Sequence, residues 1–429
     1  MSNFATLPFD IIREVTRYLK FKDLVEFMKT CKLANRVEIT NLLDIPEKYY
    51  NNLSPKYLVG KEMVHSLRAG EKLQLDSFEA LPRLKNLFVS NFHINDQAIK
   101  CLDLEQLSIS GQSKISRIGH MTNLKHLRLG NHVTPISGRE LRKLNLVTFV
   151  TNWSAHEEFK HMTNLRKLEF RSCQVLSKNL IGLNLTKLIC YYNAYELDIP
   201  HMPNLRKLYC DESATVKPET LNNLISLRLY PSCNLKVDLH HCTNLRKLYC
   251  TGPQINLNMY CQLNLESLQL LNYGHKSDLN HMTNLKKLQI RGRSLTDNEC
   301  IKDLNLEYLT LGECRVTKIN HMTRLKFLYL GKQNHRDIID LSNINLDVLL
   351  ARNCRNIENI RHMSNLQVLD CAGKCSVSQC DIKDLNIRLL YSKNNPKVRY
   401  NRLSEELMEE LENYYQPKNS EYWYYANGA

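Results

Sequence analysis

One eight-residue phrase, His-Met-Thr-Asn-Leu-x-x-Leu, occurs in seven variants at steps of 40 or 41 residues. A second phrase stands midway between successive copies, as in Leu183-Asn184-Leu185-Thr186-Lys187-Leu188. Repetition at a fixed period is typical of solenoid proteins, in which each repeat packs against its neighbours. The basic unit is therefore half of the spacing, roughly 20 residues. The seven copies begin at His120, His161, His201, His241, His281, His321 and His362.

Each unit has an anchor residue that opens a Leu-x-x-Leu pattern, with one more apolar position after it. Side chains alternate along a strand, so the second and third apolar positions fall on one face of a short strand. One strand cannot bury that face alone, and stacking of neighbouring units covers it. The pattern predicts parallel strands about 4.8 Å apart on a concave side. The sixteen anchors are Leu84, Leu104, Leu124, Leu146, Leu165, Leu185, Leu205, Leu224, Leu245, Leu265, Leu285, Leu306, Leu325, Leu346, Leu366 and Ile387.

This arrangement resembles the leucine-rich-repeat family over about three quarters of the chain. We therefore expect an α/β leucine-rich-repeat solenoid, with about 20-residue units in 40-residue pairs. Asn precedes thirteen of the sixteen anchors directly, and we expect a column of buried amides that bonds coil to coil. Between the strands, residues 95–102, 137–144, 296–304 and 376–385 have helix-compatible spacing, whereas 197–200 and 237–240 look extended.

The composition points to an intracellular protein, cytoplasmic or nuclear. No run of about 18 apolar residues is present, and residues 1–8 lack a signal-peptide pattern. Of the 15 cysteines, four fall at inward strand positions and are expected to be buried free thiols. Redox pairing, for example of Cys190 with Cys210, is the alternative. The four inward cysteines are Cys190, Cys210, Cys250 and Cys371.

Metal binding and catalysis have little support. Cys371, Cys375, Cys380 and His362 come nearest to a zinc set, but their spacing matches no two-plus-two pattern. The repeated histidines would stand roughly 10 Å apart on alternate strands, too far to share an ion, so we expect them to bond to the next coil. No glycine-rich phosphate loop or nucleophile elbow occurs. We expect no metal, no cofactor and no enzymatic activity.

The N-terminal residues differ from the repeats. Leu7, Ile11 and Val15 fall on one helical stripe, and a second helix can start at Asp23 with Glu26 three residues later. The order Leu7-Pro8, Tyr18-Leu19, Asp23-Leu24 and Cys31-Lys32 resembles an F-box, although no tryptophan follows Cys31-Lys32. A plain two-helix cap on the solenoid is the other interpretation.

The resemblance implies a partner. F-box proteins dock on the Skp adaptor of a cullin-RING ubiquitin ligase, while their repeats hold a substrate. The adaptor-binding candidates are Leu7, Pro8, Ile11, Val15, Leu19 and Leu24.

Four regions result. We assign residues 4–45 to the F-box and 46–80 to a linker with a possible degenerate first repeat around Leu73-Gln74-Leu75. Residues 81–395 form about 16 repeat units. Residues 400–429 form a C-terminal helical cap, with a helix expected at 401–415, followed by an aromatic tail.

Basic and aromatic residues occupy the strand positions that should face the concave side. With a net charge of +14, they favour an acidic or phosphorylated protein segment as ligand. Duplicated lysines that only keep the sheet soluble are an alternative, and nucleic acid is another. The substrate-binding candidates are Arg128, Lys167, Arg171, Lys187, Lys207, Tyr209, Arg228, Lys247, Tyr249, Lys287, Arg291 and Tyr329.

The sequence thus predicts a substrate-recognition subunit of an SCF-type ubiquitin ligase. A leucine-rich-repeat scaffold or inhibitor without ubiquitin transfer is the alternative, and a nucleic-acid-binding solenoid is a weaker one. The identity of the substrate is not readable from these residues.

Overall fold

The structure is a computed structural model. It describes residues 41–42, 65–69, 77–79, 81–90, 94–111, 113–131, 133, 135–152, 159, 161–171, 175–191, 197–210, 214–216, 218–229, 239–251, 257, 262–272, 276–291, 296–312, 315–331 and 338–399. The six adaptor-binding candidates, Leu73-Gln74-Leu75, the expected helix at 401–415 and the aromatic tail lie outside these residues. The chain divides into two compact units, Met1–Thr220 and Leu221–Ala429.

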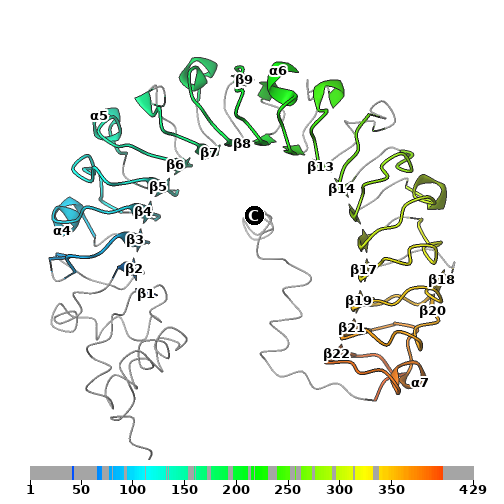
Figure 1. Ribbon diagram of the computed structural model, residues 1–429. Coiled ribbons are helices and arrows are strands. Elements are labelled where there is room, and N and C mark those ends of the chain that lie inside the picture. The colour runs from blue at the N-terminus through cyan, green and yellow to red at the C-terminus, as the bar shows by residue number, and fades with distance from the viewer. Residues whose placement is uncertain are drawn as a thin grey trace, which may run out of the picture. The chain divides into compact units, whose positions relative to one another are not determined.

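The main sheet of unit 1 is parallel, and its successive strands pair in register (Figure 1). The pairing continues from β5 to β6, β7, β8 and β10. Each coil therefore adds one strand to the edge left by the coil before it. The strands are β1 (Asn41–Leu42), β2 (Ser66–Ala69), β3 (Asn86–Val89), β4 (Gln106–Ile109), β5 (His126–Leu129), β6 (Thr148–Thr151), β7 (Lys167–Arg171), β8 (Lys187–Tyr191) and β10 (Lys207–Cys210).

Unit 2 repeats the same arrangement. In both units together, each of the sixteen strands from β3 to β22 that follow a predicted anchor begins two residues after that anchor. The predicted parallel solenoid is confirmed. The strands of unit 2 are β12 (Ser226–Leu229), β13 (Lys247–Thr251), β14 (Ser267–Leu271), β15 (Lys287–Arg291), β16 (Tyr308–Leu311), β17 (Phe327–Leu330), β19 (Val348–Leu350), β21 (Val368–Asp370) and β22 (Leu389–Tyr391).

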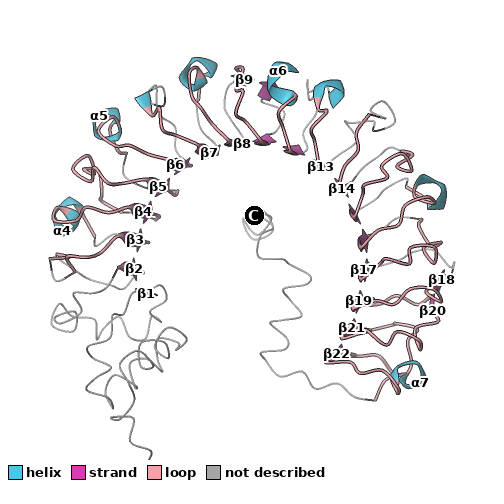
Figure 2. Ribbon diagram, in the orientation of Figure 1, coloured by secondary structure: helices cyan, strands magenta, loops and turns pink. Residues whose placement is uncertain are grey.

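In each unit, short helices and turns lie on the side opposite the strands (Figure 2). The helical expectation is confirmed for all four segments; three contain a short α-helix, and the segment 296–304 contains a short 3-10 helix. In unit 1 these elements are α4 (Asp96–Ile99), α5 (Gly138–Leu141), η5 (Ser177–Leu180), β9 (Leu197–Ile199) and β11 (Ala214–Val216). The others are α6 (Pro218–Leu221), η6 (Leu239–His241), η8 (Asn298–Cys300), β18 (Ile339–Asp340), β20 (Ile357–Glu358) and α7 (Gln379–Ile382).

The two segments expected to be extended behave differently. Residues 197–199 are a strand because β9 pairs with β11. The expectation for 237–240 is wrong at Leu239 and His240, which lie in η6. There the carbonyl of Leu239 accepts a hydrogen bond at 2.9 Å from the backbone N–H of Cys242, which closes a tight turn.

The core consists mainly of the anchor residues, the second and fourth positions of the strands and the second residue of the histidine phrase. Met121, Met282 and Met363 are fully buried at that position. The four cysteines predicted to point inward are free thiols with exposures of 0 to 2%. The interior is thus a continuous column of leucine with smaller residues between them, as the stacking argument requires.

The asparagines that precede the anchors do form hydrogen bonds between coils. These bonds join individual pairs of residues and lie near the surface. Asn204 donates from Nδ2 to Oδ1 of Asn184 at 2.6 Å, and Oδ1 of Asn345 accepts from the backbone N–H of Asn365 at 3.1 Å. Asn184, Asn204 and Asn365 are exposed and Asn345 is half-buried, so the expectation of a buried column is wrong. Water competes for these groups, and each bond therefore contributes little net stability.

Two of the repeated histidines, His120 and His362, bond to the coil that precedes them and not to the next one as expected, whereas Nε2 of His281 is buried without a hydrogen-bond partner. Nε2 of His362 lies 2.9 Å from the carbonyl oxygen of Ile344, and Nε2 of His120 lies 3.3 Å from that of Ile99. In these two repeats the histidine side chain joins its phrase to the last turn of the unit before it.

A further link between coils is made by the residue that opens α4. Asp96 accepts hydrogen bonds from the backbone N–H groups of Ser116 and Arg117 at 2.7 and 2.8 Å, and from Oγ of Ser116 at 2.8 Å. Asn298 makes the same link in unit 2, to the N–H groups of Thr317 and Lys318. Partial burial acts to raise the pKa of the Asp96 carboxyl, but these hydrogen bonds outweigh it and lower that pKa below its ordinary value of 3.8.

Asp96→Ala should lower the free energy of unfolding by about 1 to 3 kcal/mol at neutral pH, because the backbone N–H groups of Ser116 and Arg117 lose their acceptor. The folded-state pKa is depressed, so the contribution of the carboxylate is complete above its ordinary pKa and is lost as the pH falls below it. The deficit of the variant should therefore shrink as the pH falls below about 4. Urea unfolding at several pH values measures it, with exposed Glu79→Gln as control. A deficit that does not change with pH would contradict this assignment.

Candidate binding face

Three lysines stand side by side on the strand face of unit 1. Cα pairing places Lys167 opposite Lys187 and Lys187 opposite Lys207, on β7, β8 and β10. Neighbouring strands are about 4.8 Å apart, so these lysines lie closer together than lysines on alternate strands, which would be roughly 10 Å apart. Like charges at this separation repel each other, and an anionic ligand would relieve the repulsion.

An acidic residue neutralises one end of this row. Glu169, 4% exposed, receives two hydrogen bonds from Arg171, at 2.7 and 3.1 Å, and lies 3.4 Å from Nζ of Lys167. Two of the predicted binding residues are therefore already engaged. Lys207 is exposed, and no acidic residue among those described in unit 1 pairs with it.

Aromatic rings accompany the cations on this face. Nζ of Lys187 lies 4.7 Å from the ring centre of Tyr209, and the guanidinium of Arg171 lies 5.6 Å from that of Tyr191. Such contacts hold a cation in place without cancelling its charge. Arg128 is exposed on β5, two strands before β7.

Unit 2 has a sparser basic face. Ser267 stands between the exposed Lys247 and Lys287 on the neighbouring strands. Four further cation–ring contacts are found among the described residues of this unit, between Arg228 and Tyr249 at 5.1 Å, Arg291 and Tyr329 at 5.6 Å, Lys287 and Tyr308 at 5.9 Å, and Arg352 and Tyr391 at 5.0 Å. The six predicted residues of this unit therefore occupy one face of the strands β12 to β17.

The last strands of unit 2 are apolar on the same face, which sequence reasoning missed. The rings of Tyr308 and Phe327 stack with centroids 4.0 Å apart. Beyond them, Val348, Leu350, Val368 and Leu389 form a buried cluster against which Phe327, Tyr329 and Tyr391 pack. The signal was the first strand position, which changes from lysine to apolar residues after β15.

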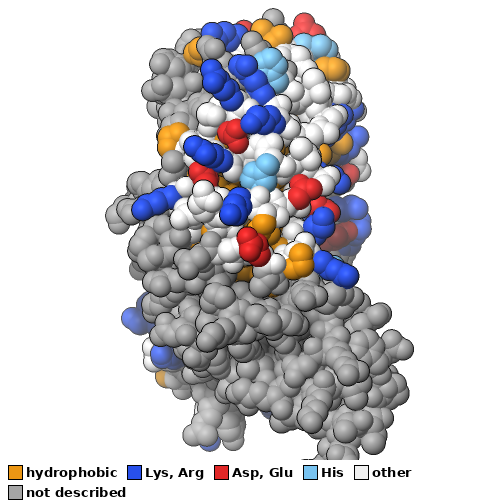
Figure 3. Space-filling view, turned by 90° about the vertical axis from the view of Figure 1, so that its left-hand side faces the viewer, with side chains coloured by type: hydrophobic (Ala, Val, Ile, Leu, Met, Phe, Trp, Pro, Cys, Tyr) orange, Lys and Arg blue, Asp and Glu red, His pale blue; other side chains and the backbone are white. Residues whose placement is uncertain are grey.

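The side opposite the strands offers no comparable basic surface in unit 1. There, basic, acidic and histidine side chains are interspersed over the described residues (Figure 3). Mixed charge of this kind keeps a surface soluble without selecting an ion of one sign.

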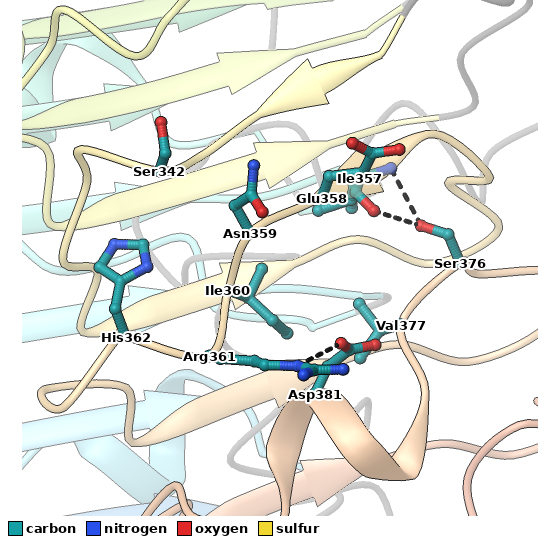
Figure 4. Close-up of a pocket in the computed structure, with 10 residues that line it drawn as sticks. All are labelled: Ser342, Ile357, Glu358, Asn359, Ile360, Arg361, His362, Ser376, Val377 and Asp381. Atoms are coloured by element: carbon teal, nitrogen blue, oxygen red, sulfur yellow. Dashed lines mark hydrogen bonds and ion pairs between the residues drawn. The ribbon is translucent and has the colours of Figure 1, made fainter.

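A pocket of about 710 Å³ lies on the turns of unit 2 (Figure 4). Its polar groups hold neighbouring coils together. Arg361 bonds Asp381 at 3.1 Å, and Oγ of Ser376 bonds the N–H and carbonyl of Ile357 at 2.9 and 2.8 Å. These polar residues of the pocket thus have a structural role, since they link neighbouring coils.

The cysteines near the end of the repeats are placed as core residues. Cys371 and Cys375 are buried, and burial raises the pKa of both thiols to about 12, so they are protonated at neutral pH. Cys380 is exposed. Among the described residues, no three His, Cys, Asp or Glu side chains are grouped as metal ligands, and no helix is long and apolar enough to cross a membrane.

Comparison with known families decides the nature of the N-terminal region. Residues 4–38 match the F-box domain family. The chain combines an F-box with leucine-rich repeats. In F-box proteins of this architecture, the general role is that of a substrate adaptor of SCF type, without catalysis of its own.

Solved structures similar to this F-box/leucine-rich-repeat chain come from bacteria and plants. An internalin of Listeria monocytogenes is 20% identical, with 62% of this chain and 86% of that chain covered and a TM-score of 0.43. A leucine-rich-repeat protein of Leptospira interrogans is 16% identical, with 88% and 97% covered and a TM-score of 0.35. A plant peptide hormone receptor in complex with its peptide is 14% identical, with 79% and 76% covered and a TM-score of 0.35. No curated protein matches the chain significantly.

Glu169→Gln should strengthen the binding of a glutamate-rich peptide by about threefold to tenfold, since it leaves Lys167 and Arg171 without their counter-charge. Fluorescence anisotropy of the labelled peptide measures the change. Glu140→Gln is the matched control, because Glu140 pairs with Lys143 at 2.8 Å on the helical side. Equal effects of the two substitutions would show that only net charge matters.

Proposed function

We propose that this protein recruits a protein substrate to an SCF-type ubiquitin ligase. Its F-box would dock the Skp adaptor through Leu7, Pro8, Ile11, Val15, Leu19 and Leu24. Its strand face would hold an acidic or phosphorylated segment of the substrate. The protein supplies proximity, and the chemistry belongs to the other ligase subunits.

The observation that carries the ligand class is the register of Lys167, Lys187 and Lys207. Stacking fixes the backbone positions of these lysines on one sheet, so their charges are gathered before an anion binds across them. The tyrosine next to the row adds apolar contact area beside the charges. An extended acidic segment fits this combination.

The adaptor proposal predicts that Leu7→Asp combined with Ile11→Asp abolishes co-purification with a Skp adaptor. Charged groups cannot be buried in an apolar interface without a large cost. Circular dichroism of the variant should match that of the unchanged protein, because the repeats do not depend on these residues. If the unchanged protein co-purifies with no Skp adaptor, the scaffold interpretation replaces this one.

The ligand proposal predicts that Lys187→Glu combined with Lys207→Glu weakens binding of a glutamate-rich peptide by about tenfold or more, roughly 1.4 kcal/mol. The matched control is Lys100→Glu combined with Lys178→Glu, two lysines on the helical side of the same unit. The same titration with a single-stranded oligonucleotide separates the classes of ligand. Tighter binding of the oligonucleotide, with a steep loss in salt, would favour the nucleic-acid alternative.

A further inference from the structure

Two strands, one in each unit, carry a lysine at their first position and an arginine at their fifth. The residue between the two cations is a glutamate on β7 and a glutamine on β15. Side chains alternate along a strand, so the first, third and fifth residues share one face. The two strands therefore differ in charge at the middle position. The residues are Lys167, Glu169 and Arg171 on β7 and Lys287, Gln289 and Arg291 on β15.

The middle residue holds the arginine in the same way on both strands. The side-chain oxygen of Gln289 accepts two hydrogen bonds from Arg291, from Nε and from Nη2, both at 2.8 Å. Glu169 accepts the corresponding pair from Arg171, at 3.1 and 2.7 Å. An amide carries no charge, so Gln289 orients the guanidinium without neutralising it, whereas Glu169 does both.

No acidic side chain among the described residues compensates the two cations of β15. The first and third positions of β14, β16 and β17 hold serine, glutamine, tyrosine, threonine and phenylalanine, all uncharged. Glu266 and Glu307 directly precede β14 and β16, but they pair with Arg246 at 4.0 Å and with Arg324 at 3.0 Å. The rings that face the cations of β15 leave their charge in place.

A phosphoryl group fits this arrangement better than a carboxylate does. It carries about −1.5 to −2 charges at neutral pH and three strong acceptor oxygens. The hydrogens that Gln289 accepts lie on one edge of the guanidinium, and the opposite edge can donate two parallel hydrogen bonds to an anion. The first and fifth positions are about 13 Å apart along the strand, but Arg291 folds back toward Gln289. The exposed Lys287 can therefore reach the same anion.

We propose that Lys287, Gln289 and Arg291 form a subsite for a phosphorylated side chain. Lys287 and Arg291 bind the phosphoryl oxygens, and Gln289 is a positioning residue for the guanidinium. The proposal rests on the proposed function, because it names the group of the substrate segment that the strand face of unit 2 binds. On β7 the carboxylate of Glu169 already supplies the negative charge.

Fluorescence anisotropy of the full chain with two labelled peptides tests the subsite. The peptides share an otherwise uncharged sequence and differ at one residue, which is phosphoserine in one and glutamate in the other. We expect the phosphoserine peptide to bind at least about tenfold more tightly, roughly 1.4 kcal/mol. An affinity for phosphoserine no greater than that for glutamate, including no binding of either peptide, would overturn the proposal.

Two variants assign the preference to β15. Gln289→Glu recreates the charge pattern of β7 and should weaken binding of the phosphoserine peptide by about tenfold. Arg291→Lys keeps the net charge but removes the planar pair of donors, so the preference for phosphoserine should fall by at least about threefold. Gln106→Glu is the matched control, because it adds the same charge to a half-buried glutamine on the strand face of β4. Phosphoserine binding that both β15 variants leave unchanged would overturn the assignment.

The outcomes separate this subsite from the rest of the proposed function. A phosphoserine preference that is lost in Gln289→Glu supports the subsite even if the chain binds no Skp adaptor. It also does so if Lys187→Glu with Lys207→Glu leaves binding of the glutamate-rich peptide unchanged, in which case the proposal for the lysine row alone fails. A single-stranded oligonucleotide that binds more tightly than the phosphoserine peptide, and is weakened equally by Gln289→Glu, would overturn the subsite in favour of nucleic acid.

Discussion

The structure depends on the need of each coil to bury its apolar strand face against a neighbour. A single unit of roughly 20 residues cannot cover its own leucines, so stability resides in the contacts between successive units. Because the contact is made by parallel strands in register, residues at the same position of successive units must lie next to each other. Changes within one unit are therefore felt mainly by the units on either side.

Because of this constraint, residues that are one repeat apart in the sequence become neighbours on the surface of the sheet. Lys167, Lys187 and Lys207 are about 20 residues apart in the chain and neighbours on the sheet. The same rule gathers valine and leucine at the first position of β19, β21 and β22 into an apolar surface. The strand face thus has a basic region in each unit and, in unit 2, an apolar region beside it.

Much of this was predictable from sequence, since the anchor leucines fix where every later strand begins. Features that depend on contacts with residues of adjacent coils were not predictable from the sequence. The pairing of Glu169 with Arg171 joins two residues of the same strand, but the burial that strengthens it comes from adjacent coils. The exposure of the asparagine pairs and the turn at Leu239 likewise depend on which neighbouring groups compete for the backbone. The apolar residues at the first strand position after β15 can be read from the sequence, but their burial cannot.

The register of the lysine row has a geometric consequence for any peptide that crosses it. An extended peptide advances about 3.3 Å per residue, so side chains on one of its faces repeat at about 6.6 Å, whereas the lysines repeat at about 4.8 Å. The spacing of the peptide side chains therefore does not match the spacing of successive lysines. Because lysine and glutamate side chains are flexible, they can bridge this mismatch over three strands without one fixed spacing of acidic residues. Binding of a segment to such a row would therefore depend on how many acidic residues the segment carries within a short length, and little on their order.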